Sequence, residues 1–286
     1  MSIHSPMMRE SEPSLRPIGV FDSGIGGLTV VRALRDLLPR EDIFYIGDTA
    51  RLPYGGKSKS TIERYSIEIS GLLLAENAKM IVVACNTSSS LAITKLQEIL
   101  KVPVVGVIAP GARAAVKETR IGHVGVIGTR STIQSEAYER AIQALNPAVR
   151  VTSQACPLLV PLVEEAWLEE EVTREVLHRY LDPVIGAGID TLVLGCTHYP
   201  LLAPLIQEVS GPGVQLVDSA KNCAVAVKQT LLEGGLENLS EGAGKLNVAL
   251  TDSSNSFLTT ARQALQLEIN SLETRIVQGM VLIETG

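Results

Sequence analysis

The chain has 286 residues, of which 45% are hydrophobic and 20% are charged, and its mean hydropathy is +0.22. This length favours two α/β domains, and the composition supplies enough apolar side chains for folded cores, which excludes a disordered chain. A net charge of −6 and a sequence pI of about 5.4 give no basic surface for nucleic acid. The longest apolar runs have only strand length, so we expect no membrane-spanning segment.

The first half of the chain alternates predicted strands and helices. Before it, the polar stretch from Met1 to Pro17 carries three prolines, so residues 1–16 are expected to form a loose N-terminal extension. Strands are then predicted at 18–22, 42–47, 80–84 and 102–108, and helices at 27–38, 61–77 and 88–100. Alternation of this kind predicts right-handed βαβ units and a parallel sheet.

The second half repeats this pattern. Predicted strands cover 124–128, 151–155, 191–194 and 214–217, with helices at 132–145 and 158–167. A tail follows, with a helix at 220–233, a strand at 246–251, a helix at 257–267 and a last strand near 275–281. We expect this tail to complete the first sheet. The predicted domains are therefore 17–109 plus 218–286 for the first, and 110–217 for the second.

Two pairs of motifs indicate that the domains are duplicated. The segment Gly-Val-Phe-Asp-Ser at 19–23 and the segment Gly-Val-Ile-Gly-Thr at 125–129 each end a strand and precede a helix, and they lie 106 residues apart. Cys85 and Cys196, each at the end of another predicted strand, lie 111 residues apart. Two independent pairs with nearly the same offset favour an internal repeat, because the polar residues match as well as the apolar ones.

The strand-end cysteines are the strongest chemical signal. Cys85-Asn86-Thr87 and Cys196-Thr197-His198 each follow a buried strand, at the carboxyl edge where parallel sheets bind ligands. One buried cysteine is usually a small apolar residue, but two in matched positions favour acid–base chemistry. A thiol on each half-site suits a reaction in which one face of a substrate loses a proton and the other gains one. We expect a lowered thiol pKa at a helix N-terminus.

Other interpretations of these residues have specific weaknesses. Cys196 and His198 could both bind zinc, but no compact second pair is nearby, so no metal site is predicted. Nothing indicates a pyridoxal lysine, so no cofactor is predicted. A Cys-His-Asp hydrolase would leave Cys85 unused, and a base only two residues from its nucleophile is awkwardly placed. A two-lobed amino-acid-binding protein without activity is a further alternative. The remaining cysteines, Cys156 and Cys223, are predicted to be packing residues, and the lack of CxxC spacing and of a signal peptide favours reduced thiols in a cytoplasm.

Two glycine-containing loops leave alternatives open. Residues 22–27 lie between a strand and a helix, and they form either a capped glycine turn or a carboxylate site at a helix N-terminus. The dinucleotide and Walker fingerprints both fail at this loop. The Pro-Tyr-Gly-Gly turn at 53–56 is either a surface loop or a substrate lid, and its composition favours a surface loop.

Taken together, these motifs resemble a known family. The segments 18–30, Gly47-Asp48 with Pro53-Tyr54-Gly55, 84–87 and 195–200 look like those of the glutamate racemases, within the cofactor-independent aspartate/glutamate racemase superfamily. The match runs from about residue 17 to 282 in the expected order. It implies an α/β fold of two pseudo-symmetric domains, each a mostly parallel sheet flanked by helices, with the active site in the interdomain cleft and often a homodimer.

The resemblance also implies a function. Glutamate racemases interconvert L- and D-glutamate without a cofactor, by proton transfer at Cα between two cysteines, and so supply D-glutamate for bacterial peptidoglycan. We therefore expect a cytoplasmic enzyme whose partner is a small molecule, with no nucleic acid or membrane partner. Aspartate or another acidic amino acid is the alternative substrate, because pocket length is poorly visible in a sequence.

The resemblance assigns roles to individual residues. Cys85 and Cys196 match the two acid/base thiols, while Asp22 and His198 match the helper beside each. The positions that hold the amino acid are Asp22, Ser23, Tyr54, Gly55, Asn86, Thr87, Thr129, Thr197 and His198. Glu164 is a further candidate, for which the neighbouring Glu165 is the alternative match.

Overall fold

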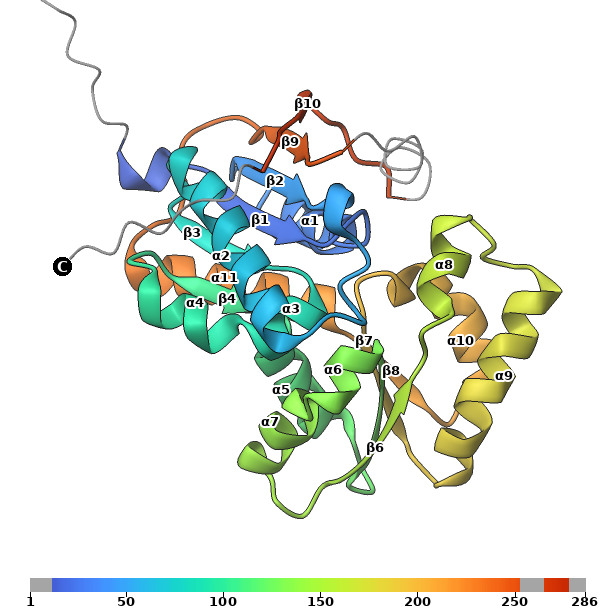
Figure 1. Cartoon of the computed structure of the whole chain (residues 1–286). Coiled ribbons are helices and arrows are strands. Elements are labelled where there is room, and N and C mark those ends of the chain that lie inside the picture. Colours follow the sequence, from blue (N-terminus) through green and yellow to red (C-terminus); the bar gives the residue numbers. More distant parts are fainter. Residues whose placement is uncertain (1–11, 253–264, 278–286) are drawn as a thin grey trace, which may run out of the picture.

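The computed structural model describes residues 12–252 and 265–277, and Figure 1 shows the arrangement of their helices and strands. The strands form two separate sheets, and every strand pair in both is parallel. Since parallel strands need helical crossovers, both faces of each sheet are covered by helices. Within this described part, no helix combines the length and apolar character needed to cross a bilayer.

The first sheet has six strands in the order β10-β9-β2-β1-β3-β4. Their bounds are β1 Ile18–Asp22, β2 Ile43–Gly47, β3 Met80–Val83, β4 Val104–Gly106, β9 Leu246–Leu250 and β10 Ser271–Thr274. Strand β9 pairs with β2, and β10 pairs with β9. The tail of the chain thus returns to the first sheet, as predicted.

The second sheet has the order β6-β5-β7-β8. Its strands are β5 His123–Gly128, β6 Arg150–Ala155, β7 Thr191–Gly195 and β8 Gln215–Asp218. In the first sheet, the four strands that come first along the chain lie in the order β2-β1-β3-β4. When the strands of each set are numbered along the chain, both sets have the order 2-1-3-4. Strands β3 and β7 therefore hold equivalent places in the two sheets, and each precedes one of the two strand-end cysteines.

Helices enclose four main cores, one on each face of each sheet. The half of the molecule built around the first sheet, here called the first half, includes α11 from late in the chain. Its helices are α1 Leu28–Leu37, α2 Lys59–Ala75, α3 Asn86–Leu91, α4 Ile93–Ile99 and α11 Ser219–Gly234, with 3-10 helices η1 Pro13–Leu15 and η2 Thr49–Arg51. In the second half they are α5 Ile108–Glu118, α6 Arg130–Gln134, α7 Ala137–Leu145, α8 Leu159–Glu164, α9 Glu171–Gly186 and α10 Ala203–Ser210, with 3-10 helix η3 Tyr199–Leu202.

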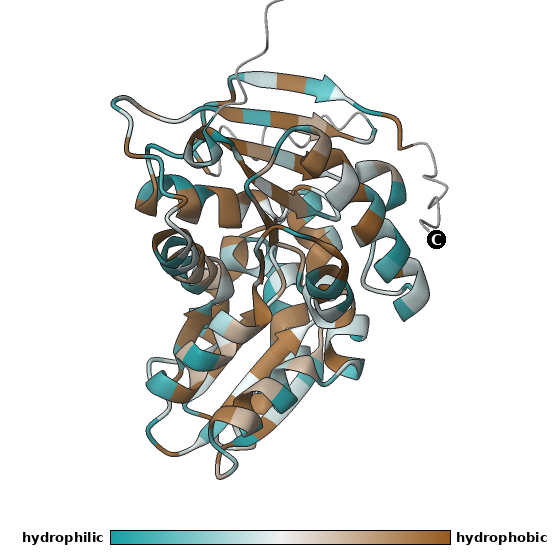
Figure 2. Ribbon diagram, turned by 90° about the vertical axis from the view of Figure 1, so that its left-hand side faces the viewer, coloured by the Kyte–Doolittle hydropathy of each residue, from teal (hydrophilic) through white to brown (hydrophobic). Residues whose placement is uncertain are grey.

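The cores show why these segments form strands and helices. Helices α1 and α11 pack on one face of the first sheet, and α2 and α4 pack on the other. Helices α8, α9 and α10 cover one face of the second sheet, while α5 and α7 cover the opposite one. Strands covered on both faces read as continuous apolar runs, so β1, β2, β3 and β7 are buried at every residue. Figure 2 shows hydrophobic residues along these strands.

Several predicted elements are interrupted in the structure. The predicted helix at 88–100 is two helices that meet at Ala92, and it begins earlier, at Asn86. The predicted helix at 132–145 is also two helices, because Glu136 adopts a left-handed φ of 53°. The strand predicted at 102–108 covers only Val104–Gly106, since α5 already begins at Ile108.

Both ends of the chain differ from the prediction. The last strand among the described residues is Ser271–Thr274. Of the strand predicted near 275–281, residues 275–277 are not in a strand and the rest lie outside the described residues. The helix predicted at 257–267 also lies mostly outside them, and 265–267 are not helical. Residues 1–11 also lie outside them, but Pro13–Leu15 form a 3-10 helix where a loose extension was expected.

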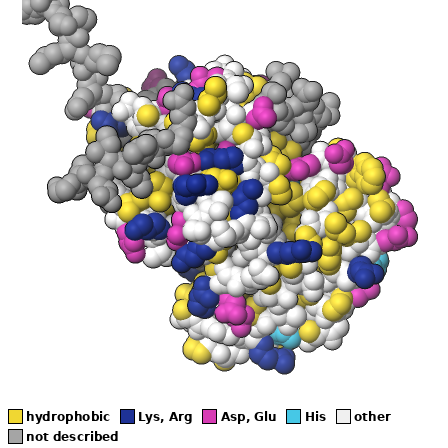
Figure 3. All heavy atoms as spheres, viewed as in Figure 1, with side chains coloured by type: hydrophobic (Ala, Val, Ile, Leu, Met, Phe, Trp, Pro, Cys, Tyr) yellow, Lys and Arg dark blue, Asp and Glu magenta, His cyan; other side chains and the backbone are white. Residues whose placement is uncertain are grey.

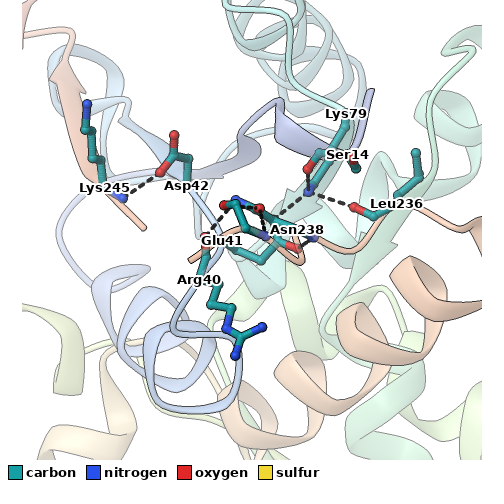
Figure 4. A network of polar contacts seen from close by, with 9 residues as sticks. Ser14, Arg40, Glu41, Asp42, Lys79, Leu236, Asn238 and Lys245 are labelled. Atoms are coloured by element: carbon teal, nitrogen blue, oxygen red, sulfur yellow. Dashed lines mark hydrogen bonds and ion pairs between the residues drawn. The ribbon is translucent and has the colours of Figure 1, made fainter. Parts of the chain in front are cut away.

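The buried Lys79 holds the chain near Ser14 against the first sheet. Its ammonium donates to the carbonyls of Ser14 at 2.6 Å and Leu236 at 2.8 Å, and it pairs with Glu41 at 2.5 Å. Figure 4 shows this network, in which Glu41 also accepts from the backbone N–H of Asn238 at 2.8 Å. One buried charge pair thus joins the start of the described chain to β3 and to the segment after α11.

Candidate active site

One cavity of about 530 Å³ is lined by residues from both halves of the molecule. Its wall includes both strand-end cysteines and every other predicted site residue except Asp22. The first half contributes Ser23, Tyr54, Gly55, Cys85, Asn86 and Thr87, and the second half contributes Thr129, Glu164, Cys196, Thr197 and His198. The carboxyl edges of the two sheets therefore meet at one site, as their motifs predicted.

Cys85 is the N-cap of helix α3, and only Ala84 separates it from the end of strand β3 at Val83. Its sulfur lies 3.8 Å from the hydroxyl of Ser23, and the residue is buried. Burial and the negative charge of Asp22 raise the pKa of Cys85 to about 12, although the backbone N–H of Ser88 acts in the opposite direction. The lowered pKa expected from the helix N-terminus is wrong, because desolvation disfavours a thiolate here and α3 has only six residues. At neutral pH Cys85 is a thiol.

Cys196 follows strand β7 and has a histidine beside its sulfur. Nδ1 of His198 lies 3.8 Å from Sγ of Cys196, and Nε2 lies 3.3 Å from Oε1 of Glu164. Burial opposes a charged ring, but Cys196 and Glu164 outweigh it and raise the pKa of His198 to about 10. The ring is therefore an imidazolium at neutral pH, placed to exchange a proton with the sulfur. No three side chains in the described part of the chain are grouped to hold a metal ion.

Glu164, rather than Glu165, lines the cavity. Glu164 ends helix α8, lines the cavity and contacts His198. Glu165 is exposed and does not line the cavity. Glu164 is the last residue of α8 and Glu165 is the next residue, so only the carboxylate of Glu164 contacts the histidine.

Asp22 lies behind the cavity wall and is completely buried. One carboxylate oxygen accepts hydrogen bonds from the backbone N–H groups of Gly24 at 3.1 Å and Gly27 at 3.0 Å. The other accepts from the hydroxyl of Thr197 at 3.4 Å. Asp22 therefore fixes the glycine turn and acts on the site through its charge, which raises the pKa values of both Cys85 and His198.

Polar side chains beside the two cysteines connect the halves of the molecule. The hydroxyl oxygens of Thr87 and Thr129 lie 3.0 Å apart, which joins α3 to the N-cap of α6. Asn86 is buried at the cavity wall, and its Oδ1 accepts a hydrogen bond of 2.7 Å from Tyr138. Its amide nitrogen has no partner within the part of the chain that the structure describes, which leaves it able to donate to a ligand.

The loop at 53–56 closes one side of the cavity. Tyr54 is buried and its hydroxyl donates to Asp48, so it offers the cavity its ring and backbone rather than its hydroxyl. A Cβ at Gly55 would lie 2.7 Å from Cβ of Thr129, so only glycine fits this close approach. Leu52, Pro53 and Gly56 are exposed and line the cavity, so the loop lies at the surface, as its composition favours, and also forms part of the cavity wall.

Sequence reasoning missed the residue that holds this loop. The backbone N–H and the hydroxyl of Ser131 both donate to the carbonyl of Gly55, at 3.0 and 2.9 Å. The hydroxyl also lies 3.3 Å from the carbonyl of Lys57. Arg130, next to Ser131, lines the cavity as well. These two residues follow Thr129 directly, and this position after a strand-end threonine is the only signal that could have marked them.

Comparison with known proteins identifies the family. The family model of Asp/Glu/hydantoin racemase matches residues 27–228. The chain belongs to this family. It is 55% identical over 231 residues to the glutamate racemase of Syntrophus aciditrophicus, covering 81% of this chain and 86% of that one. It is 49% identical over 250 residues to the glutamate racemase of Geobacter metallireducens, covering 87% and 93%.

Solved structures of glutamate racemases share this fold. The enzyme from Francisella tularensis in complex with D-glutamate has a TM-score of 0.87 at 37% identity, covering 93% of this chain and 100% of that one. Isoform RacE1 from Bacillus anthracis has a TM-score of 0.86 at 40% identity, covering 92% and 97%. The family and the fold predicted from the sequence are therefore confirmed, and the enzyme is an amino-acid racemase, which is an isomerase.

Proposed function

We propose that the enzyme interconverts L- and D-glutamate by moving protons at Cα between Cys85 and Cys196. The observation that carries this proposal is that the two thiols line a single cavity. They lie at equivalent strand ends of two sheets whose corresponding strands have the same order. Inverting a stereocentre requires proton removal on one face and return on the other, which two opposed groups achieve without rotating the substrate. The relatives named as glutamate racemases, and the neighbour in complex with D-glutamate, support glutamate as the substrate.

The chemistry needs only the two sulfurs and the substrate. One sulfur begins as a thiolate and forms an S–H bond while the Cα–H bond breaks, and the electron pair remains on the substrate, shared with its α-carboxylate. The other sulfur begins as a thiol and transfers its proton to the opposite face of Cα. The two sulfurs finish with exchanged protonation states, so no net proton is consumed.

The groups around the sulfurs suggest their starting roles. Cys85 holds its proton at neutral pH because its pKa is raised, which makes it the first acid. The imidazolium of His198 lies against the sulfur of Cys196 and is paired with Glu164. We infer that Cys196, with this cation beside it, is the first base.

The same cavity suggests how an acidic amino acid is held. The carbanion formed at Cα is stabilised by donors to the α-carboxylate, which gains charge as the proton leaves. We propose that Ser23, Tyr54, Gly55, Asn86, Thr87, Thr129, Thr197 and His198 contact the substrate. Asp22, which does not line the cavity, is proposed to assist through its charge and its turn.

Deuterium exchange tests the mechanism directly. Racemisation of L-glutamate in heavy water, followed by circular dichroism and mass spectrometry, is expected to place solvent deuterium at Cα of the product. Cys85→Ser and Cys196→Ser are each expected to slow racemisation by about 10²–10⁴-fold while retaining glutamate binding. Unlabelled product, or full turnover in either variant, would contradict the proposal.

Aspartate is the alternative substrate to exclude. A homologue of aspartate racemase from Pyrococcus horikoshii has a TM-score of 0.56 at 18% identity, and this likeness concerns the fold alone. One methylene is worth roughly 10–200-fold in discrimination. We therefore expect kcat/KM for L-glutamate to exceed that for L-aspartate by at least about tenfold, and equal values would overturn the preference.

Four further expectations accompany this function. We propose that the enzyme acts in the cytoplasm and that its D-glutamate enters peptidoglycan, which predicts that depletion arrests growth unless D-glutamate is supplied. We also propose the domain boundaries 17–109 plus 218–286 and 110–217. Finally, we propose a homodimer.

Exposed hydrophobic side chains support the dimer. Figure 3 shows such side chains on the second half of the molecule, where Leu158, Trp167 and Val172 are 52%, 47% and 41% exposed. Apolar surface of this kind commonly belongs to an interface. Sedimentation is expected to give a dimer that Trp167→Glu weakens, and a monomer in the wild type would contradict the assignment.

A further inference from the structure

Tyr138 crosses from the second half of the molecule to the cysteine turn of the first. It lies in helix α7, is almost completely buried, and donates its hydroxyl hydrogen bond of 2.7 Å to Oδ1 of Asn86. Asn86 is the residue directly after Cys85, and it lines the cavity. The phenol therefore contacts the residue next to one reacting sulfur without lining the cavity itself.

This hydrogen bond decides which end of the amide is available to a ligand. An asparagine side chain can present either an acceptor oxygen or two N–H donors. Here the oxygen is occupied by Tyr138, while Nδ2 is buried and has no partner among the described residues. A buried donor without a partner is costly, and a ligand carboxylate would satisfy it. The reverse orientation would set an oxygen against that carboxylate.

The ring of Tyr138 is itself held in place from two sides. A Cβ added at Gly111 would lie 3.1 Å from Cε1 of the ring, and one added at Gly195 would lie 3.1 Å from Cε2. Gly195 is the residue directly before Cys196. The same phenol ring therefore packs beside the strand end that carries the second sulfur, while its hydroxyl contacts the turn that carries the first.

We propose that Tyr138 is a positioning residue, which holds the Asn86 amide with its N–H donors toward the substrate carboxylate that gains charge during proton transfer. This inference rests on the proposed racemisation and deepens it. Because the donors serve a group whose charge grows in the transition state, their loss is expected to lower kcat more than it raises KM.

Tyr138→Phe removes only the hydroxyl and keeps the ring between its glycines. We expect kcat for L-glutamate to fall by about tenfold with KM changed less than about threefold. Tyr199→Phe is the matched control, because it also removes a buried phenol hydrogen bond, of 2.9 Å to the carbonyl of Cys156. The control is expected to keep kcat within about twofold, and thermal unfolding of both variants reports any general loss of stability.

A double-mutant cycle separates positioning from structural support. If Tyr138 acts through Asn86, then Tyr138→Phe causes no further loss of kcat in an Asn86→Ala background. Additive losses, unchanged kcat in Tyr138→Phe, or a Phe variant that fails to fold would each overturn the inference. Wild-type enzyme that does not racemise glutamate would contradict the proposed function instead, so the two failures are distinguishable.

Discussion

The hydroxyl of Thr197 lies 3.4 Å from the carboxylate of Asp22, so the turn after β7 is joined to the turn after β1. The same carboxylate accepts two backbone hydrogen bonds from its own glycine turn. A charge that is buried but fully hydrogen-bonded is stable in this position. Its field reaches both reacting centres, because it raises the pKa of Cys85 and that of His198.

Asp22→Asn tests this electrostatic role. The amide oxygen can keep the two backbone hydrogen bonds and the amide nitrogen can face Thr197, so the turn is retained while the charge is lost. The pKa of Cys85 is then expected to fall, and its alkylation by iodoacetamide near pH 9 to become about tenfold faster. Peptide mapping by mass spectrometry identifies the modified thiol. Asp36→Asn, at an exposed ion pair with Arg32, is the control and leaves the rate unchanged.

Glu164→Gln tests the pair that holds the histidine. Glu164 raises the pKa of His198, so its neutralisation is expected to lower that pKa from about 10 toward the ordinary value. The alkaline limb of the kcat/KM profile then moves to lower pH, with about a tenfold loss of activity near pH 9. Glu165→Gln changes the exposed neighbour and is expected to leave the profile unmoved. If both variants gave the same pH profile, the claim that Glu164 controls the pKa of His198 would be contradicted.

His198 also predicts how stability depends on pH. Its folded pKa of about 10 exceeds the ordinary value of 6.5, so the folded state holds the proton more tightly. The stabilisation is complete below about pH 6.5 and is lost as pH rises toward 10. The free energy of unfolding, measured with urea, is expected to decline over this window in the wild type. His198→Gln should decline less, and parallel curves would show that the histidine does not contribute.

The buried pair of Lys79 and Glu41 predicts a large stability effect. Their side chains are 1% and 3% exposed. Removal of one partner leaves an uncompensated buried charge, so Glu41→Gln is expected to cost about 3–5 kcal/mol in urea unfolding. Lys59→Met, at an exposed pair with Glu63, is expected to cost less than about 1 kcal/mol. Equal midpoints for these two variants would contradict a special role for the buried pair.

Gly26 predicts a loss of activity that follows from close approach. A Cβ at this position would lie 2.4 Å from Nδ1 of His198 and 2.4 Å from Oγ1 of Thr197. Gly26→Ala therefore must displace the ring from Cys196, and we expect kcat to fall by at least about tenfold. Gly186→Ala is the control, because its Cβ would meet nothing within 4 Å. Activity assays and melting curves of both variants compare the local effect with any general destabilisation.

The strands and the cysteine turns could be predicted because their signals are local. Strand β3 is an uninterrupted apolar run and β7 is mostly apolar, and a cysteine turn follows each within two residues. The break at Glu136 has no comparable signal, since it depends on the Ser135 hydroxyl, which donates to the carbonyl of Thr132 at 2.6 Å and accepts from the N–H of Ala137 at 3.2 Å.

Contacts between residues far apart in the chain could not be predicted from the sequence. Tyr138 and Asn86 are 52 positions apart, and nothing in either segment marks them as partners. The same holds for Ser131 and Gly55, which meet only because the two sheets face one cavity. The raised pKa of Cys85 was also unpredictable, because it depends on how completely the folded chain removes water from the sulfur.

The backbone passes between the two sheets twice, from β4 into α5 and back from β8 into α11, and these two helices pack against each other. Two adjoining covalent connections resist torsion far better than one. The two strand-end sulfurs are therefore carried by sheets whose relative rotation is limited by this paired connection.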